Sequence, residues 1–173
     1  MRVTGQSGQT GAGEMDMGRM LREYGDGLLR MCYLYLKDRS LAEDALQETM
    51  LRAYQARASF EGRASEKTYL TAIAANVCRN MLKSAWLRRF AGSKPLESLP
   101  APDSPGAGDF TVTRAVMALP DRLREAVVLY HYRGMKLREI AQALDISVST
   151  VSARLERAKK RLRAQLKEWY FDE

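Results

Sequence analysis

Residues 137–166 read LREIAQALDISVSTVSARLERAKKRLRAQL, with the pattern of a short helix, a tight turn and a second, basic helix. In the first helix the apolar residues recur at steps of three and four and so share one face, namely Ile140, Ala141 and Leu144. Residues 145–146 break this period, and the hydroxyl of Ser147 is suited to cap the helix that follows. The stretch therefore predicts a helix-turn-helix.

The second helix of this stretch has an apolar stripe and a polar face. The stripe consists of residues at steps of three or four, namely Val151, Leu155, Ala158, Leu162 and Leu166. The opposite face carries Ser149, Ser152, Ala153, Glu156, Arg157 and Lys160. Short side chains followed by cations suit a recognition helix in the major groove, although a charged outer face is also usual for a solvated surface helix.

The location of the charge separates these two interpretations. Between Arg133 and Lys167 there are ten Lys and Arg and three acidic residues, a net charge of +7, and the whole chain also has a formal net charge of +7. The remaining residues therefore sum to zero. Basic charge confined to a segment with helix-turn-helix patterning is what a phosphate-binding surface requires, which favours DNA binding.

Prolines mark the domain organisation. Four of the five prolines fall within residues 95–105, and the surrounding segment 91–110 has no helical or strand period, so it reads as a linker. It separates residues 15–90 from residues 111–170, each near the lower size limit for a self-sufficient core. Residues 1–14 are expected to be a disordered tail and not a signal peptide. The expected fold is all-α, with two small helical domains joined by a Pro-rich linker and the helix-turn-helix in the second.

Other features exclude several classes of function. No run approaches about eighteen apolar residues, so no membrane insertion is expected. Cys32 and Cys78 have no CxxC partner and suit a reducing, cytoplasmic location, and His131 is the single histidine, expected to be a packing residue. There is no Gly-rich phosphate loop or nucleophile elbow. We therefore expect no enzyme, no cofactor and no metal site.

Two helical patterns open the first domain. Residues 17–37 form the first, with a bend expected near Asp26 because glycines flank it. The second begins at Ser40, which can form a capping box with Glu43. Its other exposed polar residues are Asp44, Gln47, Glu48 and Arg52. Taken alone, this acidic face reads as a solvated surface, because acids near a helix N-terminus are stabilised by the helix dipole without a partner.

A loop and a third helix complete the first domain. Residues 59–66, SFEGRASE, read as a loop that exposes an aromatic ring and a cation. The following helix carries Asn76 and Asn80 on one face, where amides can bond base edges. At its basic end, Trp86 and Phe90 form either a hydrophobic clamp or a surface for nucleic-acid stacking.

Two further helices are expected before the helix-turn-helix. Residues 110–119 form a short one, Pro120 suits the start of the next, and Gly134 suits a left-handed cap at its end. The helical period of the second directs inward Leu123, Val127, Val128 and either Tyr130 or His131.

The order of these parts resembles bacterial sigma factors of the extracytoplasmic function (ECF) subfamily. Residues 42–50, AEDALQETM, match the family pattern AEDxxQExF with Met50 at the aromatic position. The third helix matches WLxxIAxNxxxNxLR with Tyr69 in place of the tryptophan. Residues 119–162 match LPxxxREVxxLxxxxGxxxxEIAxxLxISxxTVxxRLxRAxxxL. The resemblance covers nearly all of residues 24–166.

The resemblance implies a protein that binds core RNA polymerase and directs promoter recognition, promoter melting and transcription initiation, with the β′ coiled coil and the β flap as its polymerase contacts. The β′ coiled coil would be bound by Asp44, Gln47, Glu48 and Leu51. The minus-ten element would be held by Phe60, Arg63, Asn76, Arg79, Asn80 and Lys83. The minus-thirty-five duplex would be contacted by Ser147, Ser149, Thr150, Ser152, Ala153, Arg154, Arg157 and Lys160.

The resemblance also implies a monomer when free and, as often in this subfamily, an anti-sigma factor as a partner. The chain departs from the family at Ser152 and Ala153, where many relatives carry a Lys or Arg followed by Ser. Glu156 lies on the same face, where its carboxylate either accepts a bond from cytosine N4 or repels phosphate. Base preference at the upstream element is therefore the part that transfers least.

Two alternatives differ in class from a sigma factor. A dimeric helix-turn-helix regulator that is not part of polymerase would bind a palindromic site, because half-site symmetry mirrors protein symmetry. A helical adaptor whose basic helix binds acidic protein or a membrane surface would show salt-sensitive binding that is indifferent to DNA sequence. The sigma hypothesis predicts a monomer and an asymmetric two-part site.

Overall fold

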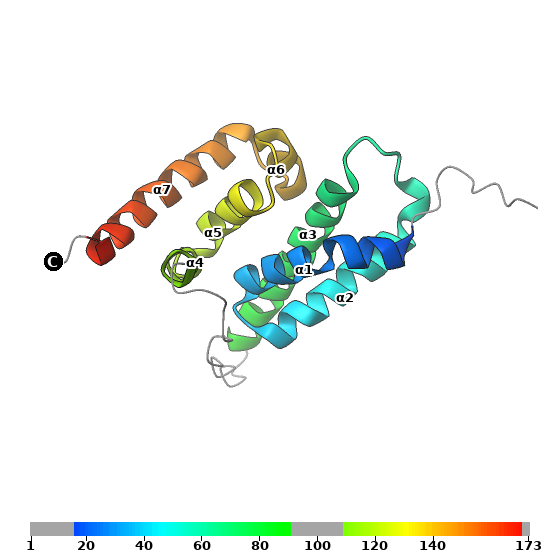
Figure 1. Cartoon of the computed structure of the whole chain (residues 1–173), viewed down its shortest axis with the longest axis horizontal. Helices are drawn as coiled ribbons and strands as arrows, with labels where there is room; N and C mark the ends of the chain where they lie inside the picture. Colours follow the sequence, from blue (N-terminus) through cyan, green and yellow to red (C-terminus); the bar gives the residue numbers. More distant parts are fainter. Residues whose placement is uncertain (1–15, 91–108, 171–173) are drawn as a thin grey trace, which may run out of the picture.

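The computed structural model describes residues 16–90 and 109–170, and within these ranges it consists of helices and their connections, with no strand (Figure 1). This confirms the all-α prediction. The expected tail at residues 1–14 and nearly all of the expected linker lie outside the described residues.

Two groups of helices are present. The first contains α1 (Met17–Leu36), α2 (Arg39–Gln55), η1 (Arg57–Ser59) and α3 (Glu66–Phe90). The second contains α4 (Asp109–Met117), α5 (Asp121–Val127), η2 (Val128–Tyr132), α6 (Leu137–Leu144) and α7 (Val148–Tyr170). In Figure 1 the second group lies beside the first, with α7 extending away from it.

The start of the α2 helix differs from the sequence prediction. The carboxylate of Asp38 accepts a hydrogen bond from the backbone N–H of Leu41 at 2.8 Å and caps α2, so the helix begins before Ser40. The first N–H groups of a helix lack partners within the helix, and Asp38, not Ser40, is the N-cap residue that accepts from one of them. The preceding α1 helix runs without a break through Gly25 and Gly27 and ends where Lys37 adopts a left-handed conformation with φ 57°.

A π-helical turn, η2, separates α5 from the loop before α6. Such a turn inserts an extra residue into the helical period and rotates the side chains that follow. Leu129 is therefore fully buried, whereas Tyr130 and His131 are exposed, contrary to the expectation that one of these two packs inward. Gly134 ends this element with φ 70°, as predicted for a left-handed cap.

The two groups of helices share one hydrophobic core. Leu28, Met31 and Leu70 of the first group belong to the same buried cluster as Leu129 and Ile140 of the second. A smaller cluster joins α4, α5 and α7 through Leu119, Leu123, Val127 and Ala158. Each group is small for an independent core, and burial against its neighbour supplies apolar area that it lacks alone.

The π-helical turn predicts a contrast between two neighbouring substitutions. Leu129→Ala removes a fully buried side chain and should lower the free energy of unfolding by about 2–5 kcal/mol. Tyr130→Ala truncates a side chain that is 40% exposed and should cost about 1 kcal/mol or less. Urea denaturation followed by circular dichroism measures both, and a larger loss for Tyr130→Ala would show that the turn is not formed.

Candidate nucleic-acid and protein interfaces

Hydroxyl groups fix the turn between α6 and α7. Asp145 ends α6 in a left-handed conformation with φ 52°. The hydroxyl of Ser147 accepts a hydrogen bond from the backbone N–H of Thr150 at 3.1 Å, which confirms its predicted role as the cap of α7. The same hydroxyl lies 2.9 Å from that of Ser149 and 2.7 Å from that of Thr150. These three predicted DNA contacts thus form one exposed hydroxyl cluster at the start of α7.

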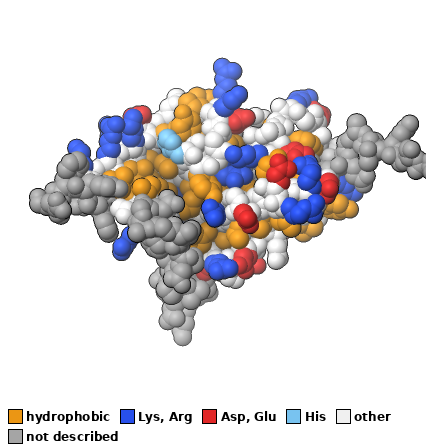
Figure 2. Space-filling model, in the orientation of Figure 1, with side chains coloured by type: hydrophobic (Ala, Val, Ile, Leu, Met, Phe, Trp, Pro, Cys, Tyr) orange, Lys and Arg blue, Asp and Glu red, His pale blue; other side chains and the backbone are white. Residues whose placement is uncertain are grey.

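The remaining part of α7 divides into a buried stripe and an outer face. Val151 and Ala158 are fully buried against the rest of the second group. Four of the predicted DNA contacts lie on the outer face. Ala153, Arg157 and Lys160 are exposed, and Ser152 is partly exposed. Figure 2 shows Lys and Arg side chains on the part of the surface formed by α7. This face is basic and accessible along its length, as binding to a phosphate backbone requires.

Arg154 lies on the other side of α7, in contact with α5. Its side chain is only 12% exposed, and its Nη1 lies 3.4 Å from Oε2 of Glu125. Glu125 is also approached by Arg79 of α3, whose Nε lies 3.4 Å from Oε1, and by the hydroxyl of Tyr35, which donates to Oε1 at 3.3 Å. Burial raises the pKa of Glu125, and the two arginines and the tyrosine hydroxyl oppose that rise.

These four residues, Tyr35, Arg79, Glu125 and Arg154, are called the Glu125 cluster below. The family resemblance selected its two arginines as predicted DNA contacts but did not point to Tyr35 or Glu125. These two residues are ninety positions apart in the chain, and no local period reports such a contact. Its own sequence context does not mark Glu125 as buried, because three charged residues closely precede it, namely Asp121, Arg122 and Arg124.

A groove between α2 and α3 gathers the four predicted polymerase contacts. Its walls are formed by Asp44, Gln47, Glu48, Leu51, Arg52, Val77, Asn80, Met81 and Ser84. Leu51 is 51% exposed, and Glu48 pairs with Arg52 at 2.6 Å. The groove thus offers a protein partner one exposed apolar side chain together with acidic and amide groups.

The other predicted minus-ten contacts lie in two places. In the loop before α3, the ring of Phe60 packs against that of Tyr69 with centroids 4.6 Å apart, and Arg63 pairs with Glu61 at 2.6 Å. On α3, Asn76 and Lys83 are exposed, while Asn80 faces the groove. The predicted set is therefore split between the loop, the exposed face of α3, the groove and, through Arg79, the Glu125 cluster.

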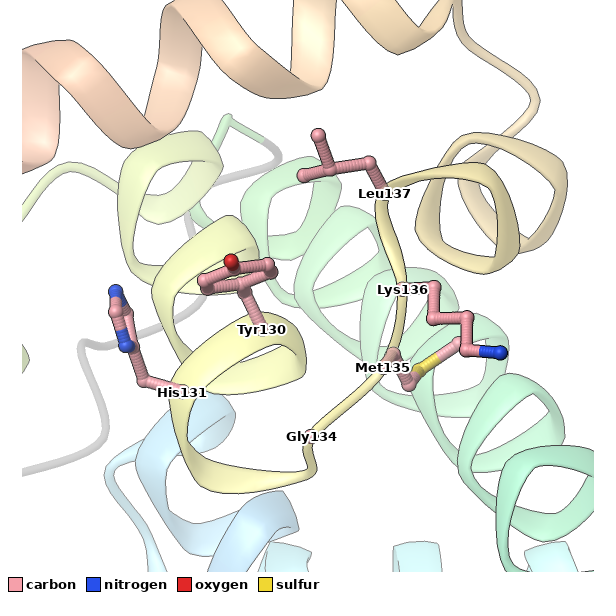
Figure 3. Close-up of a pocket in the computed structure, with 6 residues that line it drawn as sticks. All are labelled: Tyr130, His131, Gly134, Met135, Lys136 and Leu137. Carbon is pink, nitrogen blue, oxygen red and sulfur yellow. The ribbon is translucent and has the colours of Figure 1, made fainter.

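A shallow depression follows the π-helical turn (Figure 3). It is lined by Tyr130, His131, Gly134, Met135, Lys136 and Leu137. The rings of Tyr130 and His131 meet edge to face with centroids 4.8 Å apart. Sequence patterning did not find this surface, because it directed one of these two rings into the core.

Within residues 16–90 and 109–170, no group of three or more His, Cys, Asp or Glu is placed to hold a metal ion. No helix in these ranges is long and apolar enough to cross a membrane.

Two family models match the chain, one for each group of helices. The model described as Sigma-70 region 2 matches residues 20–88, from α1 to near the end of α3. The model described as Sigma-70, region 4 matches residues 110–162, which include the helix-turn-helix. Their order along the chain is the one that the sequence motifs predicted.

Curated relatives extend over most of the chain. The ECF RNA polymerase sigma factor SigM of Mycobacterium tuberculosis is 32% identical over 147 residues, which cover 83% of this chain and 74% of SigM. The RNA polymerase sigma-H factor of Pseudomonas aeruginosa is 27% identical over 156 residues, 82% of this chain and 81% of that protein. SigW of Bacillus subtilis is 28% identical over 160 residues, 84% of this chain and 86% of SigW.

Two solved structures share the fold. The sigma factor RpoE of Bartonella quintana, solved with the anti-sigma factor NepR, has a TM-score of 0.75 at 23% identity, covering 91% of this chain and 99% of that one. CnrH, solved with the cytosolic domain of CnrY, has a TM-score of 0.63 at 22% identity, covering 88% of each chain. From the two family matches and the relative at 32% identity, the chain belongs to the extracytoplasmic function subfamily of bacterial RNA polymerase sigma factors.

Proposed function

We propose that this sigma factor binds core RNA polymerase through the α2–α3 groove, holds the melted minus-ten element with the loop before α3 and the exposed face of that helix, and contacts the minus-thirty-five duplex with α7. The observation that carries the proposal is the convergence of Asp44, Gln47, Glu48 and Leu51 on one groove. The family resemblance assigned these residues together, as one face of α2, and the structure adds a facing wall from α3. Their common location supports a single docking surface for the β′ coiled coil.

The chemistry of the groove favours a helical protein partner. Leu51 offers exposed apolar area, and Asp44 and Glu48 place negative charge beside it. A partner with basic side chains around an apolar stripe would complement both features. The coiled coil of β′ is the partner that the family assigns to this face, and the β flap is proposed as a second polymerase contact.

The outer face of α7 supports duplex binding. Arg157 and Lys160 are exposed beyond the hydroxyl cluster of Ser147, Ser149 and Thr150. Hydroxyl groups at a helix N-terminus can bond bases or phosphates, and the cations that follow neutralise phosphate. The arrangement supports an anchoring contact with duplex DNA in which phosphate binding contributes more than base reading.

An anti-sigma factor is a further proposed partner. The two solved relatives are complexes, one with the anti-sigma factor NepR and one with the cytosolic domain of CnrY. We place the sigma factor in the cytoplasm, where it meets polymerase, and expect it to be a monomer when free. Family membership does not favour the dimeric regulator considered from the sequence.

Polymerase docking predicts a selective loss in a groove variant. Asp44→Ala combined with Gln47→Ala should weaken binding to core RNA polymerase by about tenfold or more, because both side chains line the groove. Binding to free duplex should stay unchanged. Glu43→Ala is the matched control, since Glu43 is an exposed acid of α2 that pairs with Arg39. Titration of labelled protein with core enzyme gives both affinities, and an equal loss of polymerase and DNA binding would mean that the face is structural.

Phosphate contact by α7 predicts a change in salt dependence. Arg157→Ala should weaken binding to a minus-thirty-five duplex, and the slope of log affinity against log salt should become shallower by about one counterion. Arg30→Ala removes an exposed arginine from α1 and should leave the slope at its original value. Fluorescence anisotropy at several salt concentrations measures the slope, and an unchanged slope would place Arg157 off the DNA.

A further inference from the structure

One carboxylate binds two arginines that belong to different predicted DNA contacts. Arg79 is a minus-ten candidate on α3, and Arg154 is a minus-thirty-five candidate on α7. Their guanidinium groups reach opposite oxygens of Glu125, Oε1 for Arg79 and Oε2 for Arg154, each at 3.4 Å. Carboxylate and phosphate oxygens offer guanidinium the same charge-assisted hydrogen bonds. A guanidinium N–H group that binds Glu125 is therefore not available to bind a phosphate oxygen at the same time.

The two groups of helices are joined by hydrogen bonds as well as by the shared apolar core. Arg124 donates from Nη2 to the backbone oxygen of Tyr35 at 2.9 Å, and Arg79 donates from Nη1 to the backbone oxygen of Leu144 at 3.3 Å. Arg133, which is 7% exposed, donates from Nε to the hydroxyl of Thr71 at 3.1 Å. These bonds join α1 and α3 to α5, α6 and the residue after η2.

Gly27 shows how closely the two groups approach. A Cβ at this position would lie 2.5 Å from Nη1 of Arg133, so any larger residue would require Arg133 to move. Gly27 lies inside α1, where glycine is otherwise less favourable than alanine by about 1 kcal/mol. In this arrangement of the two groups, the guanidinium of Arg133 occupies space that a Cβ at position 27 would need.

The contact between the two groups of helices is called the seam below, and burial of charge there reduces the net gain from ion pairing. The side chain of Glu125 is 6% exposed, and burial raises its pKa despite the neighbouring arginines. The side chain of Arg154 is 12% exposed, and removing it and Glu125 from water costs free energy that their attraction only partly restores. When the two groups of helices separate, Glu125 and Arg154 regain water, which offsets part of the loss of the ion pairs. The Glu125 cluster thus defines a geometry without making separation prohibitive.

We propose that the free sigma factor adopts a closed state in which Glu125 holds Arg79 and Arg154 away from DNA, and that separation of the two groups of helices releases both arginines for promoter binding. The closed state is inferred from the contacts at the seam. The competition between Glu125 and DNA rests, in addition, on the proposed function. The outer face of α7 stays accessible in the closed state. Initial duplex contact and full engagement are then separate steps, with opening between them.

The distance between the two groups tests the closed state directly. Donor and acceptor dyes are attached to the full chain through Ala58→Cys and Ala164→Cys, which are exposed positions in η1 and α7. The native thiols of Cys32 and Cys78 are buried and react slowly with dyes. Single-molecule energy transfer should give one population for this parent, with the efficiency set by the closed arrangement. Glu125→Gln and Arg79→Gln should each move molecules to a second population of different efficiency, because each removes a charged partner from the cluster.

Two further variants make the result interpretable. Lys67→Gln removes an exposed cation from α3 outside the seam and should keep the parent distribution. If Glu125→Gln unfolds, as judged by circular dichroism, Arg79→Gln decides, because its side chain is 41% exposed and it can be removed with less disturbance. Folded Glu125→Gln and Arg79→Gln variants that both keep the parent distribution would overturn the proposal.

Duplex affinity tests the competition. Glu125→Gln, which frees Arg154 and leaves every predicted DNA contact in place, should bind a minus-thirty-five duplex about fivefold more tightly. Equal or weaker binding by a folded Glu125→Gln variant would contradict competition between Glu125 and DNA. The energy-transfer experiment contains no polymerase and no DNA. It therefore tests the closed state independently of the proposed polymerase docking.

Discussion

The carboxylate of Glu125 lies where four helices meet, and its need for partners constrains all of them. A charge with 6% exposure must be paired or hydrogen-bonded, and here the partners come from α1, α3 and α7. Their positions relative to α5 are thereby linked. The same seam continues into the apolar core that joins Leu28 and Leu70 to Leu129 and Ile140. In the closed arrangement the two groups of helices thus pack against each other as one unit.

The two faces to which we assign binding lie outside this shared contact. The α2–α3 groove opens on the first group, and the basic outer face of α7 lies on the second. Because both sit on helices whose opposite faces are buried, their side chains are held by packing and not by flexible segments. Both proposed interfaces are therefore presented by helices that pack on the same core.

Local features of the fold were predictable from the sequence because their causes are local. The turn between α6 and α7, the Ser147 cap and the left-handed Gly134 follow from residues within a few positions of each other. The acidic face of α2 was read first as solvated, and motif matching then selected the residues that line the groove. Neither the helical period nor the motif could show that α3 forms the other wall of the groove, because that wall depends on how α2 and α3 pack together.

The features that escaped prediction have distant or subtle causes. The π-helical turn changes the period by one residue, so Leu129 packs inward where the regular period selected Tyr130 or His131. Arg79 and Arg154 looked like free surface cations because Glu125 is remote from Arg79 in sequence. The role of Gly27 depends on Arg133, more than a hundred positions later in the chain.

The central claim is that this chain gives core RNA polymerase its promoter specificity. In vitro transcription with purified core enzyme and a library of promoter fragments tests that claim most directly. Addition of the chain should produce transcripts that start at a defined subset of fragments sharing two separated, asymmetric elements. A transcript pattern identical to that of core enzyme alone would contradict the claim.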